Sequence, residues 1–142
     1  MHTEHMWIYF SGTFSSLVEA QAKAGFLEEA QASLDEAFAA VEKLDERYWE
    51  AEVHRLKGEL LYKQGDDVNA EASFNKAIEI SRKQSAKSLE LRAAMSQCRL
   101  WEKQGKKAEA HQILTEIYNW FTEGFNTPDL VEAKTLLEKL QK

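Results

Sequence analysis

The sequence predicts an all-α fold, a right-handed superhelix of three helical hairpins with a forty-residue period and a C-terminal capping helix. Gly25, Gly65 and Gly105 stand forty residues apart, and each is followed five residues later by an alanine. The stretches that begin at these glycines align with one another: GFLEEAQASLDEAF, GDDVNAEASFNKAI and GKKAEAHQILTEIY. A fixed period of about 20 to 50 residues is typical of stacked repeats, which usually present a surface to a partner.

Composition and charge exclude several classes of protein. The 142 residues, 44% hydrophobic and 30% charged, suit one domain, so we expect a single repeat domain over residues 1–142. The sequence contains no signal peptide and no apolar run of about 20 residues, which predicts a cytoplasmic protein without a membrane segment. A net charge of −6 argues against nucleic acid as a partner.

The charge is unevenly distributed along the chain. Residues 1–50 carry three Lys or Arg against ten Asp or Glu, a net charge of −7. Residues 51–100 carry nine against seven, a net charge of +2. We interpret these charges first as solvated helix faces. The alternative is that the acidic and basic segments join two copies into a homodimer.

Apolar residues recur at steps of three and four, the period of amphipathic helices. Each repeated glycine then separates two helices, because glycine adopts the left-handed conformation of a helix end without steric cost. Turns of about one to three residues force each helix pair into an antiparallel hairpin. The predicted hairpins cover about residues 4–44, 47–84 and 87–122, the last helix of the third running over about 106–122, and the capping helix covers about 128–141.

Two helix starts carry specific signals. Asp66 or Asp67 can accept a hydrogen bond from the first amides of the helix after the second glycine. Thr127 can cap the final helix, Pro128 suits its first position, and Asp129 favours its positive end. The final helix has one apolar stripe, made of Leu130, Ala133, Leu137 and Leu140. A one-sided helix is what the end of a stack needs, because its outer face has no neighbour.

The small and large residues of these hairpins resemble the tetratricopeptide (TPR) pattern. In the second repeat, Gly58, Ala70, Phe74 and Ala77 fall at the pattern's spacing. The corresponding residues are Cys98, Ala110, Leu114 and Ile117 in the third repeat and Val18, Ala30, Leu34 and Ala37 in the first, where valine is a departure. The period of forty in place of thirty-four, and the missing closing proline, are further departures. The resemblance implies a stack of hairpins that binds a protein or peptide.

A narrower resemblance covers nearly the whole chain. The runs RYWEAEVHRLKGELLYKQGD, SLELRAAMSQCRLWEKQGK and YNWFTEGFNTPDLVEAKTLLEKL are similar to the C-terminal TPR segment of large bacterial signalling proteins. In those proteins the segment follows an ATPase module, often with a nucleotide cyclase or a DNA-binding regulatory domain further upstream. The resemblance implies a sensing or assembly role and suggests that the chain is the C-terminal part of a longer protein.

We interpret the single cysteine and the histidines, which could in principle be catalytic or metal-binding residues, as having no such role. No GxxxxGK[ST] phosphate-binding motif is present. Cys98 falls at the tight-packing site of its hairpin, so we interpret it as a buried structural residue. His2 and His5 have a metal-binding spacing but lie at a terminus without a third ligand, so no metal site is expected. His54 stands where the pattern has an aromatic, which predicts an interior histidine, and His111 is expected at the surface.

Aromatic residues recur at helical spacing. They include Trp7, Tyr9, Trp49, Tyr62, Trp101, Trp120 and Phe121. We expect them to pack between repeats, the alternative being a ligand cage.

Any binding surface is expected on the concave face, which the first helix of each hairpin lines. The residues predicted to contact a partner are Glu19, Arg55, Glu59, Tyr62, Lys63, Arg92, Met95, Arg99 and Lys103. The four cations Arg55, Arg92, Arg99 and Lys103 could clamp an acidic segment or a terminal carboxylate. The alternative, equally open from the sequence, is that they pair with Glu52, Glu59 and Glu102 on the same face.

We therefore expect a non-catalytic protein–protein interaction module without a cofactor, most specifically part of a bacterial signal-transduction protein. Its expected partner is a protein or peptide. A small-ligand effector-sensing module and a homodimerisation domain of a larger regulator are the two alternatives.

Overall fold

A computed structural model describes residues 13–44 and 48–141, and all regular structure in these residues is helical. The helices pair around the predicted glycine turns. Their bounds are α2 Thr13–Lys23, α3 Leu27–Leu44, α4 Glu50–Lys63, α5 Asp67–Lys83, α6 Lys87–Lys103, α7 Lys107–Tyr118 and α8 Pro128–Leu140. The prediction of an all-α fold is confirmed. Part of the first predicted helix, over about 4–24, lies outside the described residues.

The turns within the hairpins form as the sequence predicts. Gly25, Gly65 and Gly105 have φ of 87°, 85° and 81°, in the left-handed region that costs a larger residue energy. Asp66 caps α5, because its side chain accepts a hydrogen bond from the Asn69 amide at 3.2 Å. Each hairpin can therefore reverse direction within a few residues.

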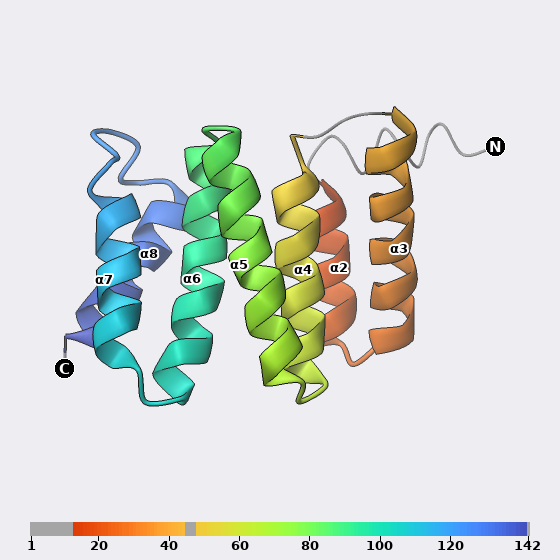
Figure 1. Cartoon of the computed structure of the whole chain (residues 1–142), viewed down its shortest axis with the longest axis horizontal. Helices are drawn as coiled ribbons and strands as arrows, with labels where there is room; N and C mark the ends of the chain where they lie inside the picture. Colours follow the sequence, from red (N-terminus) through yellow and green to blue (C-terminus); the bar gives the residue numbers. More distant parts are fainter. Residues whose placement is uncertain (1–12, 45–47, 142) are drawn as a thin grey trace.

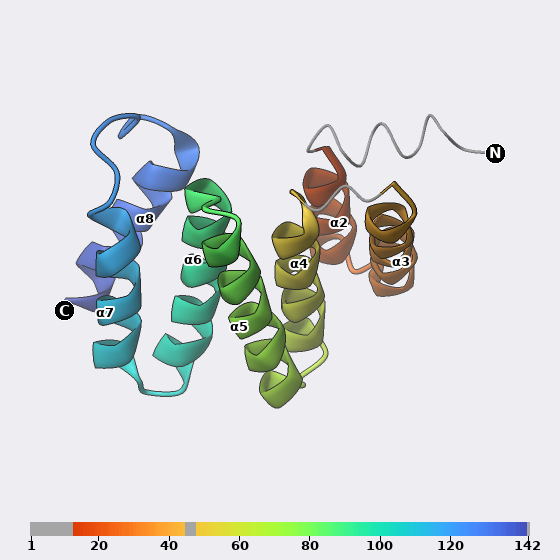
Figure 2. The ribbon, with the colours of Figure 1, turned by 45° about the horizontal axis from the view of Figure 1, so that its top comes forward.

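The helices stand side by side along the long axis of the molecule, from α3 at one end to α7 and α8 at the other (Figure 1). The first helices of the hairpins contact one another in order, α2 with α4 and α4 with α6, and α8 then contacts both α6 and α7. Among the described residues, the backbones of the second helices α3, α5 and α7 lie farther apart, with no Cα atoms of two of these helices within 8 Å of each other. The view in Figure 2 shows the successive hairpins turning relative to one another. This arrangement brings α2, α4, α6 and α8 together on one side.

The small residues of the TPR pattern sit against large buried ones. At Gly58, an added Cβ would lie 2.5 Å from Cε1 of Phe74, and Phe74 is 1% exposed. In the third hairpin the same position is Cys98, which faces the smaller Leu114 in the same core cluster. The first hairpin places Val18 with Leu34. The smallest of the three residues, Gly58, thus faces the largest partner, Phe74.

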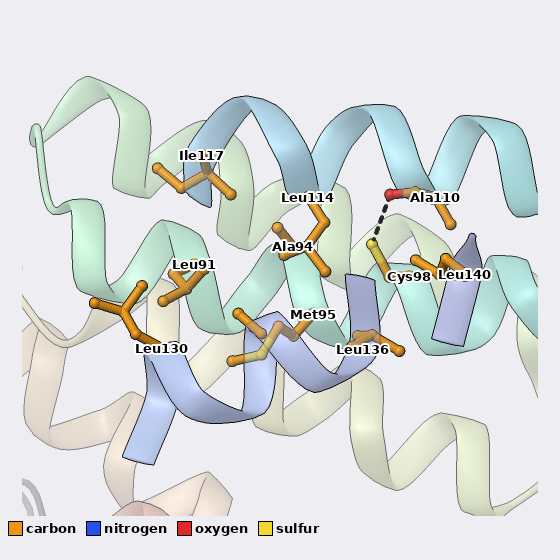
Figure 3. Packing of buried hydrophobic residues seen from close by; sticks show 11 residues of the cluster. Leu91, Ala94, Met95, Cys98, Ala110, Leu114, Ile117, Leu130, Leu136 and Leu140 are labelled. Carbon is orange, nitrogen blue, oxygen red and sulfur yellow. Dashed lines mark hydrogen bonds between the residues drawn. The ribbon is translucent and has the colours of Figure 1, made fainter. Parts of the chain in front are cut away.

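The final helix closes the stack by packing its apolar stripe against the third hairpin (Figure 3). Its buried residues are Leu130, Ala133, Leu136 and Leu140. Thr127 occupies the N-cap position with extended φ and ψ, but its side chain makes no capping hydrogen bond. Pro128 begins the helix as predicted.

Two helix boundaries differ from the prediction: α4 begins at Glu50, about three residues after the predicted start of its hairpin, and α7 ends early. Helix α7 ends at Tyr118, whereas its pattern predicts an end near residue 122. The amides of Trp120 and Phe121 donate to the carbonyls three residues before them, which tightens the last turn and lets the chain leave the helix. The apolar residues after Tyr118 extended the predicted stripe although they lie outside the helix.

Candidate interaction groove

The concave side carries a polar pocket of about 230 Å³ to which four helices contribute. Helices α2, α4, α6 and α8 each supply charged or hydroxyl side chains. The pocket is lined by Ser15, Ser16, Glu19, Arg55, Arg92, Met95, Arg99, Asp129 and Glu132. Five of the nine residues predicted for the partner surface are therefore brought together here, namely Glu19, Arg55, Arg92, Met95 and Arg99. We call this pocket the concave groove.

A buried carboxylate lies under the groove and holds two arginines. Glu52, 1% exposed, accepts hydrogen bonds from Nε and Nη2 of Arg55 at 2.8 and 2.9 Å, and from Nη1 of Arg92 at 3.0 Å. Burial raises the pKa of the Glu52 carboxyl, but the charges and hydrogen bonds of Arg55 and Arg92 outweigh it, so this pKa lies below its ordinary value. Glu52 is therefore ionised at neutral pH and joins α4 to α6.

Arg55 is itself a buried group. Its third contact is Nη1 to the hydroxyl of Ser96 at 3.3 Å, and Glu19 of α2 lies 3.6 Å from Nη2. Burial lowers the pKa of the Arg55 guanidinium, but the nearby Glu52 outweighs this and raises it above the ordinary value. With these contacts, Arg55 serves the packing of α2, α4 and α6, and its donors face inward.

The two other arginines of the groove reach the capping helix. Nε of Arg92 donates to Asp129 at 2.9 Å, and Nη2 of Arg99 donates to Glu132. At the far end of α6, Glu102 pairs with Lys139 of α8 at 3.4 Å. Burial lowers the pKa of Arg92, but the nearby Glu52 and Asp129 raise it by more. The pKa of Arg92 therefore lies above its ordinary value. Three ion pairs therefore fasten α8 along α6.

The ion pairs answer part of the question that the sequence left open. The predicted pairing with Glu52 is present for Arg55 and Arg92. The other partners, Asp129 and Glu132, come from the capping helix, more than thirty residues away in sequence. Periodicity places residues on a helix face but does not say which helix will lie opposite, so these partners could not be found that way. The one signal, for Asp129 alone, was its place in the first turn of the predicted capping helix.

The remaining predicted residues extend the surface toward the other end of α4. Glu19, Glu59 and Lys63 line a second hollow between α2 and α4, whose floor is formed by apolar side chains. The ammonium of Lys103 lies 4.9 Å from the ring centre of Tyr62, a cation–π contact between α6 and α4. The floor residues are Val18, Ala22, Leu56 and Leu60. The predicted residues thus lie in two separate hollows and in this cation–π contact, all on α2, α4 and α6.

Met95 differs from the other predicted residues because it belongs to the core. It is 3% exposed and packs in the cluster that α8 covers. Met95 is buried because the capping helix packs over this part of α6.

The cysteine and the histidine that the sequence singled out as possible reactive groups, Cys98 and His54, pack against neighbouring residues. Cys98 is 0% exposed and donates to the carbonyl of Ala110 at 3.0 Å, and burial raises the pKa of its thiol to about 12. His54 packs against the ring of Phe38 at 5.1 Å between ring centres, and burial lowers its pKa. In residues 13–44 and 48–141 no three acidic, His or Cys side chains cluster as metal ligands do. His2 and His5 lie outside that range.

Most of the described aromatics pack between helices, as predicted. Trp49, Tyr62, Trp101 and Phe121 are partly buried against core clusters. Of the aromatics named above, Trp120 is exposed, and Phe26, Tyr48 and Phe125 are exposed as well. Trp7 and Tyr9 lie outside the described residues.

Successive helical hairpins whose first helices line a polar groove define a helical-repeat binding protein. The sequence matches the family model for the tetratricopeptide repeat over residues 10–83, just over half of the chain. The chain therefore belongs to the tetratricopeptide repeat family. Proteins with this repeat generally act as non-catalytic scaffolds in protein–protein interaction.

Searches among curated proteins and among solved structures gave no match. None of the helices in the described part of the chain combines the length and apolar character that a membrane crossing requires.

Proposed function

We propose that the chain is a non-catalytic protein-binding module of a bacterial signal-transduction protein, and that its concave groove holds a segment of the partner. The observation that carries the proposal is the groove itself, in which four helices present charged side chains already fixed by ion pairs. Polar groups that are ordered before binding lose less conformational entropy on association.

Arg92 and Arg99 are the residues that we propose contact partner carboxylates. Arg92 uses Nε and Nη1 for Asp129 and Glu52, and Arg99 uses Nη2 for Glu132. A guanidinium has five N–H donors, so both retain donors for a further acceptor. Their side chains are 35% and 41% exposed, whereas Arg55 is buried with its donors committed.

The second hollow extends the proposed contact along the chain of the partner. Glu19, Glu59 and Lys63 place both signs of charge over an apolar floor. Lys103 of α6 and Tyr62 of α4 are held together by their cation–π contact. A segment with one or more carboxylates followed by an apolar residue and a cation fits this order of groups.

The signalling context is supported by the three sequence runs that resemble the C-terminal TPR segment of bacterial regulators. The full open reading frame tests it directly. An ATPase or cyclase domain upstream of Met1 would support a regulatory module, and a frame that starts at Met1 would contradict it in favour of a separate adaptor.

The binding role is tested with an acidic peptide of about ten residues with a free terminal carboxylate, titrated into the labelled chain and followed by NMR. We expect shifts confined to residues of the concave groove. Arg99→Ala should weaken binding about tenfold, the loss of one charge-assisted contact, and Lys134→Ala on the exposed side of α8 should leave it unchanged. Equal effects of the two variants, or no shifts at all, would contradict the proposal.

A further inference from the structure

We propose that the chain self-associates by placing an acidic stripe on α3 of one copy in a basic groove between α4 and α5 of another. The inference is independent of the concave groove, because it uses the opposite side of α4. The basic groove is lined by His54, Lys57 and Leu61 of α4 and by Asn69, Ala72, Ser73 and Lys76 of α5.

The basic groove follows from how the α4–α5 hairpin aligns its residues. Counted from the turn at Gly65, His54 and Lys76 lie eleven residues away on the two sides, and Lys57 and Ser73 lie eight. Antiparallel helices place such residues at the same height, so the cationic groups gather in the same part of the groove. The residues on α4 that line it are spaced over two turns, about 10 Å, so the groove can take about two turns of another helix at a time.

The groove carries positive charge without an acidic partner. Neither Lys57 nor Lys76 forms an ion pair with a carboxylate in the part of the chain that the structure describes. Burial lowers the pKa of His54. Among the nearby charged groups, Glu50 raises this pKa, whereas Lys57 and Lys76 lower it. The concave groove differs, since its arginines are paired. The unpaired lysines favour an occupant that brings carboxylates.

The acidic occupant is present in the same chain. On the side away from the core, α3 exposes a stripe of residues at steps of four, three, four and three. The stripe is made of Glu28, Ala32, Asp35, Ala39 and Glu42. These steps lie on one face of a helix. Carboxylates thus alternate with alanines, whose small side chains let another surface approach closely. This acidic stripe agrees with the net −7 of residues 1–50, opposite in sign to the +2 of residues 51–100.

The stripe and the groove adjoin each other in the fold. Phe38 of α3 contacts the ring of His54 at 5.1 Å between ring centres, so α3 lies beside the groove. A two-fold axis near this contact would bring α3 of each copy to the groove of the other. Both complementary contacts are then made in a closed dimer, which is the commonest symmetry of self-associating proteins. We therefore assign the occupant as a second copy.

Light scattering after gel filtration of the whole chain tests this assignment, at chain concentrations up to about 0.1 mM. At about 0.02 M salt we expect twice the mass of the chain, and at about 0.5 M salt the single mass, because salt screens the contact. Two charge reversals should each raise the dimer dissociation constant about tenfold or more. One is Lys57→Glu with Lys76→Glu, and the other is Glu28→Lys with Asp35→Lys and Glu42→Lys.

Mixing the two reversed variants supplies the sharpest result. In the mixture each groove meets a stripe of opposite charge, so a mixed dimer should form although neither variant associates alone. Lys106→Glu with Lys134→Glu, two exposed lysines elsewhere, is the matched control and should stay dimeric. Circular dichroism verifies that each variant is folded. A monomeric wild type at low salt, an unaffected charge-reversed variant, or a mixture that remains monomeric would overturn the inference.

Discussion

Gly58 determines how closely α4 and α5 approach. A Cβ at this position meets the Phe74 ring at 2.5 Å and the Ala70 carbonyl at 3.1 Å. Alanine recovers about 1 kcal/mol of helix propensity over glycine, whereas overpacking against a fixed ring costs about 1–3 kcal/mol or more. Because Phe74 is fully buried, we expect Gly58→Ala to lower the free energy of unfolding by about 1–2 kcal/mol, measured by urea denaturation.

The third hairpin shows how such a clash is relieved. Gly58→Cys with Phe74→Leu reproduces the pair Cys98 and Leu114, so the double variant should lose less stability than the sum of its single changes, by about 1 kcal/mol or more. Additive effects would show that ring volume does not select glycine here.

The buried network around Glu52 predicts a second effect. Glu52→Gln removes the carboxylate that pairs with Arg55 and Arg92 and leaves the buried Arg55 only the more distant Glu19, at 3.6 Å, so unfolding should become easier by about 3–5 kcal/mol. Glu132→Gln alters the exposed pair with Arg99 and should cost under about 1 kcal/mol. Thermal denaturation at neutral pH compares the two, and equal losses would contradict the buried role of Glu52.

The lowered pKa of Glu52 also predicts an acid dependence. A carboxyl whose pKa is lower in the folded than in the unfolded chain contributes stability above its unfolded pKa, and this contribution is lost as pH falls through the folded pKa. We expect the wild type to lose stability below about pH 4.5, the ordinary value for this carboxyl. Glu52→Gln should flatten that part of the curve, measured by urea denaturation from neutral pH downward, and a parallel curve would contradict the assignment.

At the scale of elements, α8 is held by one apolar face and three ion pairs. Leu136→Asp places a charge in the buried cluster and should release α8, whereas Val131→Asp on its exposed side should not. Released α8 uncovers Met95 and its neighbours. We therefore expect Leu136→Asp to increase binding of a hydrophobic dye and trypsin cleavage after Lys134, with most helical circular dichroism retained.

The sequence locates helix boundaries well where a boundary has a local cause. Left-handed glycines end the first helices of the hairpins, and Asp66 and Pro128 begin later ones. It failed at the end of α7, where an apolar residue such as Phe121 continues the stripe outside the helix. It also missed the groove contacts of α8, because those depend on which element packs opposite and not on a helix's own period.

At the scale of the molecule, the apolar core is divided into clusters along the stack. One cluster joins α2, α3 and α4, and another joins α6, α7 and α8. The forty-residue period predicts this division, since each hairpin occupies equivalent space and meets only its neighbours. Leu34 and Leu114 occupy equivalent positions in these two clusters, and each is 0% exposed.

Because the core is divided into clusters, we expect a core substitution to destabilise mainly the helices of its own cluster. Leu34→Ala and Leu114→Ala should each cost about 2–5 kcal/mol, because both leave a cavity in a closed cluster. Stability in a stack is a sum of hairpins and their interfaces, so the two losses should be felt at different ends. Hydrogen exchange should show lost protection in α2 and α3 for the first variant, with α6–α8 protected as in the wild type, and the reverse for the second. Uniform loss of protection in both variants would show instead that the stack unfolds as one cooperative unit.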